Sequence, residues 1–233
     1  MIISRTPFRV SLFGGGSDYP QWYRKHGGCV VGMAINKYCY ISLRELPPFF
    51  DHHHRIVYSK VETVKDIDNI EHPAVRAVLN ETGVDGGLEI HHDGDLPAHS
   101  GLGSSSSFTV GLLNAIYALK SETLSRHSLA LEAIRIEQNV IKEHVGSQDQ
   151  VWAAYGGLNR INFDLDGSIE VEPLILKEGR REELLASLCL IFSGSTRLAP
   201  VVAKNKIENL DRCHDQIKEM RDMVDEAVSI FQT

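Results

Sequence analysis

The chain has 233 residues, enough for one large or two small domains with a buried core. Its formal net charge of −7 argues against a broad surface for nucleic acid or anionic membranes, because both need basic fields. No apolar run approaches the length of a membrane span, and no signal-like region opens the chain. The four cysteines show no CxxC pairing, as in proteins with reduced thiols, so we expect a soluble cytoplasmic protein.

The N-terminal segment predicts a strand that ends in a glycine-rich turn. Residues Ile2–Phe13 alternate loosely, and three successive glycines follow at 14–16. Such glycines forgo side-chain packing, which is tolerable where the backbone passes close to a ligand. Asp18, just beyond them, is able to accept hydrogen bonds from two neighbouring hydroxyls of a sugar. An Asx turn before Pro20 explains the same residue equally well, so both interpretations stay open.

The segment up to residue 92 is interpreted as scaffold. It predicts a second strand at Gly32–Leu43, a helix at Pro73–Glu81 that stops at Gly83, and a third strand at Leu88–His92. Three consecutive histidines, 52–54, lie between these elements. Adjacent side chains point in different directions on any regular backbone, so a solvated loop is favoured over a metal centre.

The stretch Pro97–Ser107 combines two glycines with four serines and precedes an apolar helix. Gly101 and Gly103 allow a tight turn, and the serines offer N-caps and donors at the helix start. A helix N-terminus fixed on a core presents unpaired N–H groups to an anion. The stretch lacks the Gly-Lys-Ser/Thr ending of a P-loop and the third glycine of a Rossmann turn. We interpret it as a phosphate-binding loop, since a flexible Gly/Ser linker is a poor fit between a strand and a patterned helix.

A second long helix is predicted from about Ser128 to Gly146. On spacing alone, Glu137 is interpreted as a solvated carboxylate on this helix. Asp149 follows the expected helix stop and precedes small residues and a glycine pair at 156–157. A carboxylate in such a loop is held rigidly beside a ligand, which makes Asp149 a candidate site residue.

The C-terminal third predicts a hairpin, a buried strand and a long helix. A strand at Leu158–Phe163 leads into a turn at Asp164–Gly167. A short buried strand is expected at Leu188–Phe192, and an amphipathic helical pattern runs over Val201–Phe231, with a break expected near Asp211.

Three segments, in order, resemble the motifs of the GHMP kinase family, the small-molecule kinases named for galactokinase, homoserine kinase, mevalonate kinase and phosphomevalonate kinase. They are Arg5–Tyr19, Pro97–Ser106 and Val145–Gln150. The resemblance covers essentially the whole chain. It implies an α+β fold, with a GHMP-kinase-like N-terminal domain of the ribosomal protein S5 domain 2-like type at residues 1–183. Residues 184–233 would then be the start of a ferredoxin-like C-terminal domain.

The resemblance also implies roles for individual residues, with ATP and Mg²⁺ as cofactors. Asp149 becomes the candidate base for a sugar hydroxyl, and Arg9 lies beside it, keeping the carboxylate ionised and offsetting transition-state charge. Mg²⁺ would be held by Ser105 and Glu137. ATP would be bound by Pro97, Ser100, Gly101, Leu102, Gly103, Ser104, Ser105 and Ser106. The sugar would be bound by Gly15, Gly16, Ser17, Asp18 and Tyr19.

Three further segments narrow the resemblance to the bacterial D-glycero-D-manno-heptose 7-phosphate kinases. They are Gly14–Asp18, Pro47–His52 and Glu71–Ala74. These enzymes phosphorylate the anomeric hydroxyl of the sugar phosphate to give the 1,7-bisphosphate. Fucose and galactose kinases share much of the first motif, so another sugar-1-kinase remains the alternative. Arg44 or Arg55 is a candidate contact to a sugar phosphate.

One departure from the family pattern favours a different class of function. The family's third glycine-rich motif has no counterpart here, and members usually run longer, which suggests a truncated or short form. The last helix would then expose an apolar face, which predicts self-association, for instance as a homodimer. A non-catalytic protein that binds a sugar or nucleotide is therefore the second hypothesis.

Overall fold

The computed structural model describes residues 1–84, 86–97, 100–191, 210 and 212–233. These residues form two compact units that interleave along the sequence. Unit 1 comprises residues 1–9, 35–145 and 149–156, and unit 2 comprises residues 10–34, 146–148 and 157–233. The predicted domain boundary after residue 183 falls inside unit 2.

Unit 1 contains a mixed sheet built on the second half of β2 (Gly28–Glu45). This half pairs antiparallel with β5 (Leu88–Gly94), in a register that sets Cys39 opposite Gly94. Strand β3 (His54–Val57) runs parallel to β5 and antiparallel to β4 (Val61–Val64). Strand β1 (Ile2–Phe13) pairs with β2. The strands predicted for β1, β2 and β5 are thus confirmed, with β2 longer at both ends than expected.

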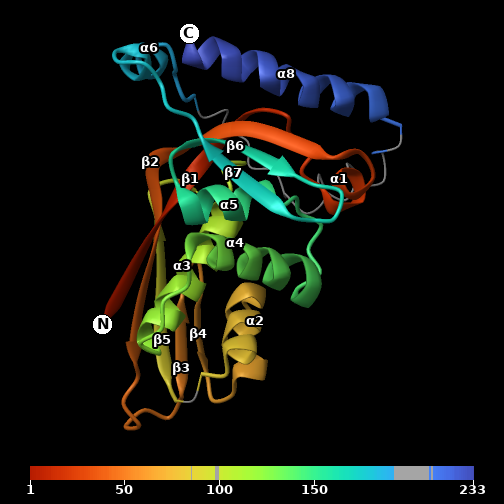
Figure 1. Cartoon of the computed structure of the whole chain (residues 1–233). Coiled ribbons are helices and arrows are strands. Elements are labelled where there is room, and N and C mark those ends of the chain that lie inside the picture. The colour runs from red at the N-terminus through yellow and green to blue at the C-terminus, as the bar shows by residue number, and fades with distance from the viewer. Residues whose placement is uncertain (85, 98–99, 192–209, 211) are drawn as a thin grey trace. The chain divides into compact units, whose positions relative to one another are not determined.

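Helices cover one face of the unit 1 sheet, as Figure 1 shows for α2 (Pro73–Thr82) and α3 (Ser104–Leu119). The core between them follows the strand alternation, since Cys39, Ile41 and Leu43 of β2 are fully buried. The predicted stop of α2 is confirmed, because Gly83 takes a left-handed conformation with φ of 58°. A short 3₁₀ turn, η1 (Ile67–Asn69), precedes α2.

The second long helix of unit 1 ends earlier than predicted. Helix α4 covers Arg126–Arg135, with Ser125 as its N-cap, and passes into a single π-helical segment, η2 (Ile136–Val140). The chain then runs without helix up to α5 (Gln148–Tyr155). Asp149 therefore lies in the first turn of a short helix, where a loop was expected.

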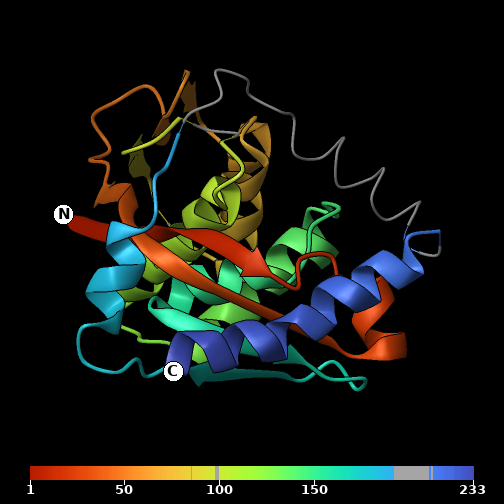
Figure 2. The same ribbon diagram turned by 90° about the horizontal axis from the view of Figure 1, so that it is seen from above.

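Unit 2 pairs the first half of β2 with a hairpin. Strand β6 (Leu158–Phe163) is antiparallel both to β2 and to β7 (Ile169–Pro173), which confirms the predicted turn at Asp164–Gly167. Helix α1 (Pro20–His26) follows the glycine turn, and α6 (Arg180–Ala186) and α8 (His214–Gln232) complete the described helices of this unit. Figure 2 shows α8 crossing β2.

One prediction about the C-terminal third is wrong, and another is confirmed only in part. Residues 188–191 form no strand, and Leu188, Leu190 and Ile191 are exposed because no described element covers them. Helix α8 buries part of its apolar face, since Ile217 packs with Trp22, and Val224 with Val31 of β2, but Met220, Met223 and Ile230 are exposed as predicted for an uncovered face. Residues 192–209 and 211, which include most of the first part of the predicted tail helix, lie outside the described residues. Over the described part of the chain, no helix has the length and apolar character needed to cross a bilayer.

Candidate functional site

The phosphate-binding loop predicted from sequence is fastened to β1 by three hydrogen bonds within unit 1. The backbone N–H of Arg9 donates to the Leu102 carbonyl (3.0 Å), and its Nη1 donates to the Gly101 carbonyl (2.8 Å). The hydroxyl of Ser107 donates to the Pro7 carbonyl (2.8 Å). The loop is thus held at the start of α3 by contacts across about a hundred residues of sequence.

Glycines set the backbone of this loop. Gly101 and Gly103 take left-handed conformations, with φ of 78° and 76°. Gly103 occupies the N-cap of α3, and no side chain caps this helix. The expectation that a serine caps α3 is therefore wrong, and the N–H groups of its first turn are left for other acceptors.

The loop serines point in different directions. Ser105 is exposed, whereas Ser106 and Ser107 are buried. The Ser100 hydroxyl is buried without a partner, and Pro97 and Gly101 are exposed. His99 lies outside the described residues.

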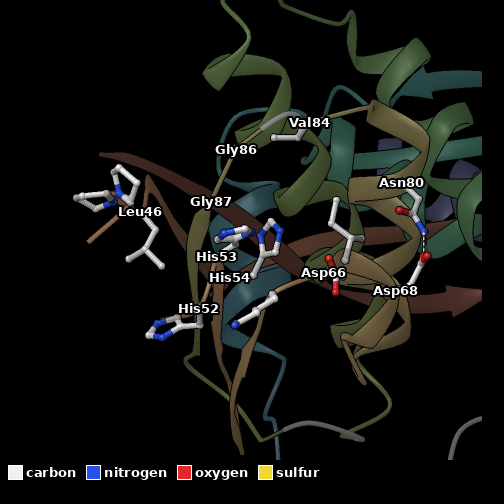
Figure 3. A pocket seen from close by; sticks show the side chains of 14 residues that line it. Leu46, His52, His53, His54, Asp66, Asp68, Asn80, Val84, Gly86 and Gly87 are labelled. Atoms are coloured by element: carbon white, nitrogen blue, oxygen red, sulfur yellow. Dashed lines mark hydrogen bonds between the residues drawn. The ribbon is translucent and has the colours of Figure 1, made fainter. Parts of the chain in front are cut away.

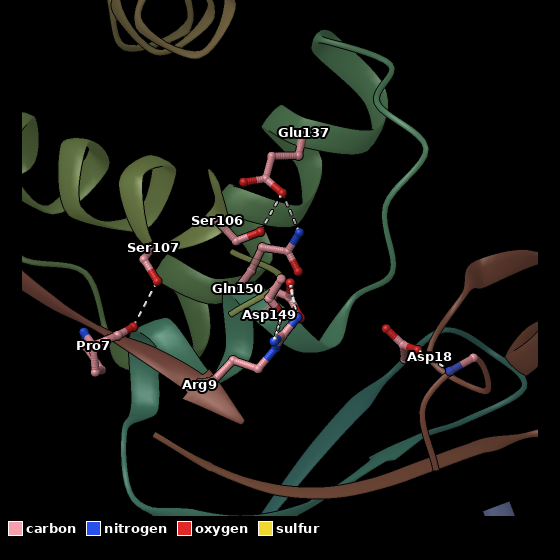
Figure 4. A network of polar contacts seen from close by, with 10 residues as sticks. Pro7, Arg9, Asp18, Ser106, Ser107, Glu137, Asp149 and Gln150 are labelled. Atoms are coloured by element: carbon pink, nitrogen blue, oxygen red, sulfur yellow. Dashed lines mark hydrogen bonds and ion pairs between the residues drawn. The ribbon is translucent and has the colours of Figure 1, made fainter. Parts of the chain in front are cut away.

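Arg9 and Asp149 form a bidentate ion pair beside this loop (Figure 4). Nε of Arg9 donates to Oδ1 of Asp149 (2.7 Å), and Nη2 donates to Oδ2 (2.6 Å). A Cβ added at Gly103 would lie 3.4 Å from Asp149 Oδ2 and 3.3 Å from Arg9 Cγ. The predicted proximity of Arg9, Asp149 and the loop is thus confirmed, and the glycine provides the space for it.

Glu137 is buried rather than solvated, which corrects the interpretation from spacing alone. Its side chain is 1% exposed on η2. The widened π-helical turn, in which Ile141 N–H donates to the Ile136 carbonyl, is a feature often found at functional sites. Oε2 of Glu137 accepts from Ser106 Oγ (2.9 Å) and Gln150 Nε2 (2.5 Å), while Oε1 is buried with no hydrogen-bond partner.

The serine that contacts Glu137 directly is Ser106, whereas Ser105, which the resemblance implies as a Mg²⁺ ligand together with Glu137, is exposed. Successive residues of an α-helix point about 100° apart, so only one of the two hydroxyls meets the carboxylate. Burial raises the pKa of Glu137 to about 7, although the hydrogen bonds from Ser106 and Gln150 act in the opposite direction.

Gln150 was not predicted as a site residue. It is fully buried and follows Asp149 directly on α5, and its side-chain amide donates a hydrogen bond to the Glu137 carboxylate. Helix α5 therefore presents two neighbouring polar side chains to two partners, Asp149 to Arg9 and Gln150 to Glu137. The signal available in the sequence was a Gln-Asp-Gln run between a glycine and an apolar segment.

The predicted sugar-binding residues belong to unit 2. Ser17, Asp18 and Tyr19 are buried, at 0%, 1% and 8% exposure, whereas Gly15 and Gly16 are partly exposed. Oδ1 of Asp18 accepts from the Gly16 N–H (3.0 Å), and the Asp18 carbonyl accepts from Ser147 N–H (3.0 Å). The bond to Oδ1 comes from the N–H two residues before Asp18, so it is not the Asx turn considered before Pro20, which has no N–H to donate.

Gly146 explains how Asp18 is packed. A Cβ at this position would fall 1.9 Å from Asp18 Oδ2, so only glycine fits. Within unit 2, Gly146 of the third sequence motif therefore packs directly against the carboxylate of Asp18 in the first motif.

The two arginines considered as contacts to a sugar phosphate pair with a single carboxylate. Arg44 and Arg55 both pair with Glu89, near the start of β5 and at the end away from the loop. Hydrogen bonds from His91, Arg44 and Arg55 hold the pKa of Glu89 at about 2. This cluster accounts for both arginines as partners of one buried carboxylate.

Residues 68–157 match the family of GHMP kinases N terminal domains. The chain is 29% identical over 214 residues to the D-glycero-alpha-D-manno-heptose 7-phosphate kinase of Campylobacter jejuni, covering 88% of this chain and 63% of that protein. It is 30% identical over 200 residues to a galactokinase of Thermococcus kodakarensis, and this match covers 78% of this chain and 55% of the galactokinase. The chain thus spans less than two thirds of the length of these relatives.

Solved structures agree with this likeness. A D-glycero-D-manno-heptose 1-phosphate kinase from Bacteroides thetaiotaomicron superposes with a TM-score of 0.71 at 26% identity, covering 79% of this chain and 63% of that one. A mevalonate kinase at 20% identity superposes with a TM-score of 0.65 over 98% of this chain and 73% of its own, which shows the fold alone. The chain therefore contains a GHMP kinase N-terminal domain and has the fold of that family.

Proposed function

We propose that this chain is the nucleotide- and sugar-binding part of an ATP-dependent sugar kinase. The acceptor is the anomeric hydroxyl of a sugar, with D-glycero-D-manno-heptose 7-phosphate as the substrate and the 1,7-bisphosphate as the product. The observation that supports the proposal most directly is the ion pair between Arg9 and Asp149, whose side chains lie next to Gly103 of the phosphate-binding loop. An ionisable side chain next to an anion-binding helix start is the arrangement that phosphoryl transfer needs.

The phosphates of ATP would bind at the loop. The first turn of α3 has uncapped N–H groups, and the neighbouring Ser104 and Ser105 are not fully buried. Hydrogen bonds to Arg9 and Pro7 fix this turn before a ligand arrives, which lowers the entropy cost of binding.

The residues around Glu137 fit a magnesium ion. A buried carboxylate oxygen without a partner, Oε1, is costly unless a cation or donor satisfies it. Mg²⁺ often takes one carboxylate and completes its shell with water and phosphate oxygens. Glu137 would hold the ion with a hydroxyl of Ser105 or Ser106. When bound, ATP supplies the phosphoryl group and Mg²⁺ neutralises its negative charge.

Asp149 would accept the proton of the sugar hydroxyl or orient that hydroxyl for attack. Base catalysis contributes roughly 10²- to 10⁴-fold, and positioning contributes the larger share. Arg9 fixes both oxygens of the carboxylate, so its direction is set before the sugar arrives. The turn at Gly15–Tyr19, with Asp18, would contribute the sugar contacts.

ADP release with a panel of acceptors tests this function. We expect turnover with the heptose 7-phosphate, and little with fucose or galactose. Asp149→Asn should lose most turnover and keep nucleotide affinity, while Asp164→Asn, in the β6–β7 turn, should behave as wild type. Unchanged turnover in Asp149→Asn removes that residue from the mechanism. Ligand-induced thermal stabilisation without ADP from any acceptor would instead identify a non-catalytic binding protein.

A further inference from the structure

A pocket of about 530 Å³ opens at the end of the unit 1 sheet, but its wall selects no ligand (Figure 3). Two exposed carboxylates, Asp66 and Asp68, line it together with the exposed ammonium of Lys65. A lining of mixed charge favours neither an anion nor a cation. His54, in the same wall, is 5% exposed, so the prediction of a solvated histidine loop is wrong for this residue. The pocket therefore assigns no function.

Gln150 is a buried side chain whose amide is only half satisfied. It lies on α5, is fully buried, and its Nε2 donates to Oε2 of Glu137 (2.5 Å). Its Oε1 is buried and has no hydrogen-bond partner among the described residues. A buried oxygen without a partner is costly, and an apolar side chain would fill the same space without that cost. Packing alone therefore does not account for the amide, whereas its hydrogen bond to Glu137 does.

Two donors converge on a single oxygen of the Glu137 carboxylate. Oε2 accepts from Ser106 Oγ (2.9 Å) as well as from Gln150 Nε2, and Figure 4 shows both bonds meeting at this oxygen. A carboxylate oxygen has two lone pairs, so Oε2 is fully engaged. Oε1 is buried and accepts no hydrogen bond from the described residues. The donors come from two elements of unit 1, α3 and α5, and together they fix the direction of the carboxylate.

This arrangement limits how Glu137 is able to bind a cation. With both lone pairs of Oε2 engaged, only Oε1 is left to ligate a metal. Mg²⁺ is small, prefers six oxygens in an octahedron and binds through one or two carboxylates while it keeps several waters. Ca²⁺ is larger, takes six to eight oxygens and often takes both oxygens of one carboxylate. A carboxylate with one free oxygen therefore suits Mg²⁺ better than Ca²⁺.

We propose that Gln150 is a positioning residue that restricts Glu137 to one metal-ligating oxygen and thereby selects Mg²⁺ over Ca²⁺. The inference rests on the proposed function, which assigns Mg²⁺ to Glu137. Gln150 acts through the carboxylate, since its Nε2 is a donor and does not ligate a cation. Residues that orient a metal ligand in this way typically change metal affinity by about 10- to 100-fold when they are replaced.

Gln150→Met tests the role of the amide. Methionine has nearly the same length and fills the same space, but it donates no hydrogen bond and has no buried oxygen to satisfy. Oε2 of Glu137 would then keep only the bond from Ser106, and the carboxylate would be free to turn both oxygens to a cation. If Gln150→Met fails to fold, Gln150→Leu removes the same donor with a different shape.

The measurement is the affinity of the full chain for Mn²⁺ by electron paramagnetic resonance, in the presence of a non-hydrolysable ATP analogue. Displacement of Mn²⁺ by Mg²⁺ and by Ca²⁺ then gives the affinity for each ion. We expect wild type to prefer Mg²⁺. In Gln150→Met the affinity for Mg²⁺ should fall about tenfold, whereas the affinity for Ca²⁺ should fall less, so the preference narrows.

Val151→Ala is the matched control on the same helix. Val151 is 1% exposed and carries no polar group, so this change loosens the packing of α5 but leaves both donors to Glu137 in place. The ratio of Ca²⁺ to Mg²⁺ affinity should stay at the wild-type value. An unchanged ratio in Gln150→Met, or an equal change in Val151→Ala, would overturn the inference.

The outcome is separable from that of the proposed function. ADP release by wild type together with an unchanged ratio in Gln150→Met would remove the role of Gln150 and leave the kinase in place. Failure of wild type to bind Mn²⁺ with the nucleotide analogue would overturn both the magnesium site at Glu137 and the role of Gln150.

Discussion

The guanidinium of Arg9 and the carboxylate of Asp149 meet through two parallel hydrogen bonds of 2.7 and 2.6 Å, although 140 residues separate them in the chain. The Arg9 side chain is 13% exposed and that of Asp149 is 25% exposed, so water screens the pair only partly. Arg9 also donates to the Gly101 carbonyl, so one side chain orients the candidate base and fixes the phosphate loop.

Arg9→Lys should therefore lower kcat strongly while the chain still folds. Lysine keeps the charge but not the planar fork, so the bidentate geometry and the Gly101 contact are lost. Loss of charged hydrogen bonds of about 1.5 to 3 kcal/mol predicts a decrease of roughly 10- to 100-fold. Steady-state kinetics with the heptose phosphate measures it. Arg5→Lys is the matched control on the same strand, since Arg5 lies over the Tyr38 ring at 4.5 Å. Equal kinetics in the two variants would contradict the assigned role.

Ser106→Ala and Ser105→Ala separate the two neighbouring hydroxyls. Ser106 donates to buried Glu137, so its loss should destabilise the fold by about 1 to 3 kcal/mol, whereas exposed Ser105 should change stability by less than about 0.5 kcal/mol. Urea unfolding above the Glu137 pKa of about 7 measures both, because the carboxylate is then ionised. The opposite order of stabilities would contradict the contact between Ser106 and Glu137.

Local features of the sequence were sufficient for most of unit 1. Alternation of apolar residues predicted β1, a short strand-like run predicted β5, and glycine predicted the end of α2 and the turns of the loop. These features depend on a few neighbouring residues. The strand expected at Leu188–Phe192 shows the limit, because its described residues, 188–191, form no strand, and an apolar run forms a strand only where a partner strand is present.

The site itself could not be derived from spacing. The partners of Glu137 lie 31 and 13 residues away, and its burial depends on a π-helical turn that no periodicity predicts. Spacing alone therefore assigned it to solvent. The pairing of Arg9 with Asp149 came from the resemblance to a family, since a contact across 140 residues leaves no local pattern.

Gly103→Ala tests whether the loop requires glycine for its backbone and for space. The left-handed φ of 76° costs an alanine about 1 to 2 kcal/mol, and the new Cβ would press on Arg9 and Asp149. Gly83→Ala is the control, because φ is 58° and nothing lies within 4 Å of the added Cβ. Both variants should lose similar stability in thermal unfolding, but only Gly103→Ala should lose nucleotide affinity in calorimetry. Equal nucleotide affinities would show that the crowding at Gly103 has no effect on the site.

His72 gives the chain a defined dependence of stability on pH. Its Nδ1 caps α2 by accepting from Val75 N–H (3.4 Å), and burial, with a smaller effect of His92, lowers its pKa from 6.5 to about 4. The folded protein therefore favours the neutral ring, and between pH 6.5 and 4 the unfolded chain binds more protons. Stability should fall as the pH is lowered through this window, by at most about 3 kcal/mol from this residue.

His72→Asn isolates this effect, because asparagine caps a helix well but does not titrate. Denaturant unfolding of both proteins should give similar free energies above about pH 6.5, where the His72 ring is neutral in the folded and the unfolded chain. The curves should diverge as the pH is lowered through the window, with wild type losing stability more steeply than the variant. Since every other titrating group is common to the two chains, the difference between the curves belongs to His72. Parallel curves across the window would mean that the pKa of this imidazole is not lowered in the fold.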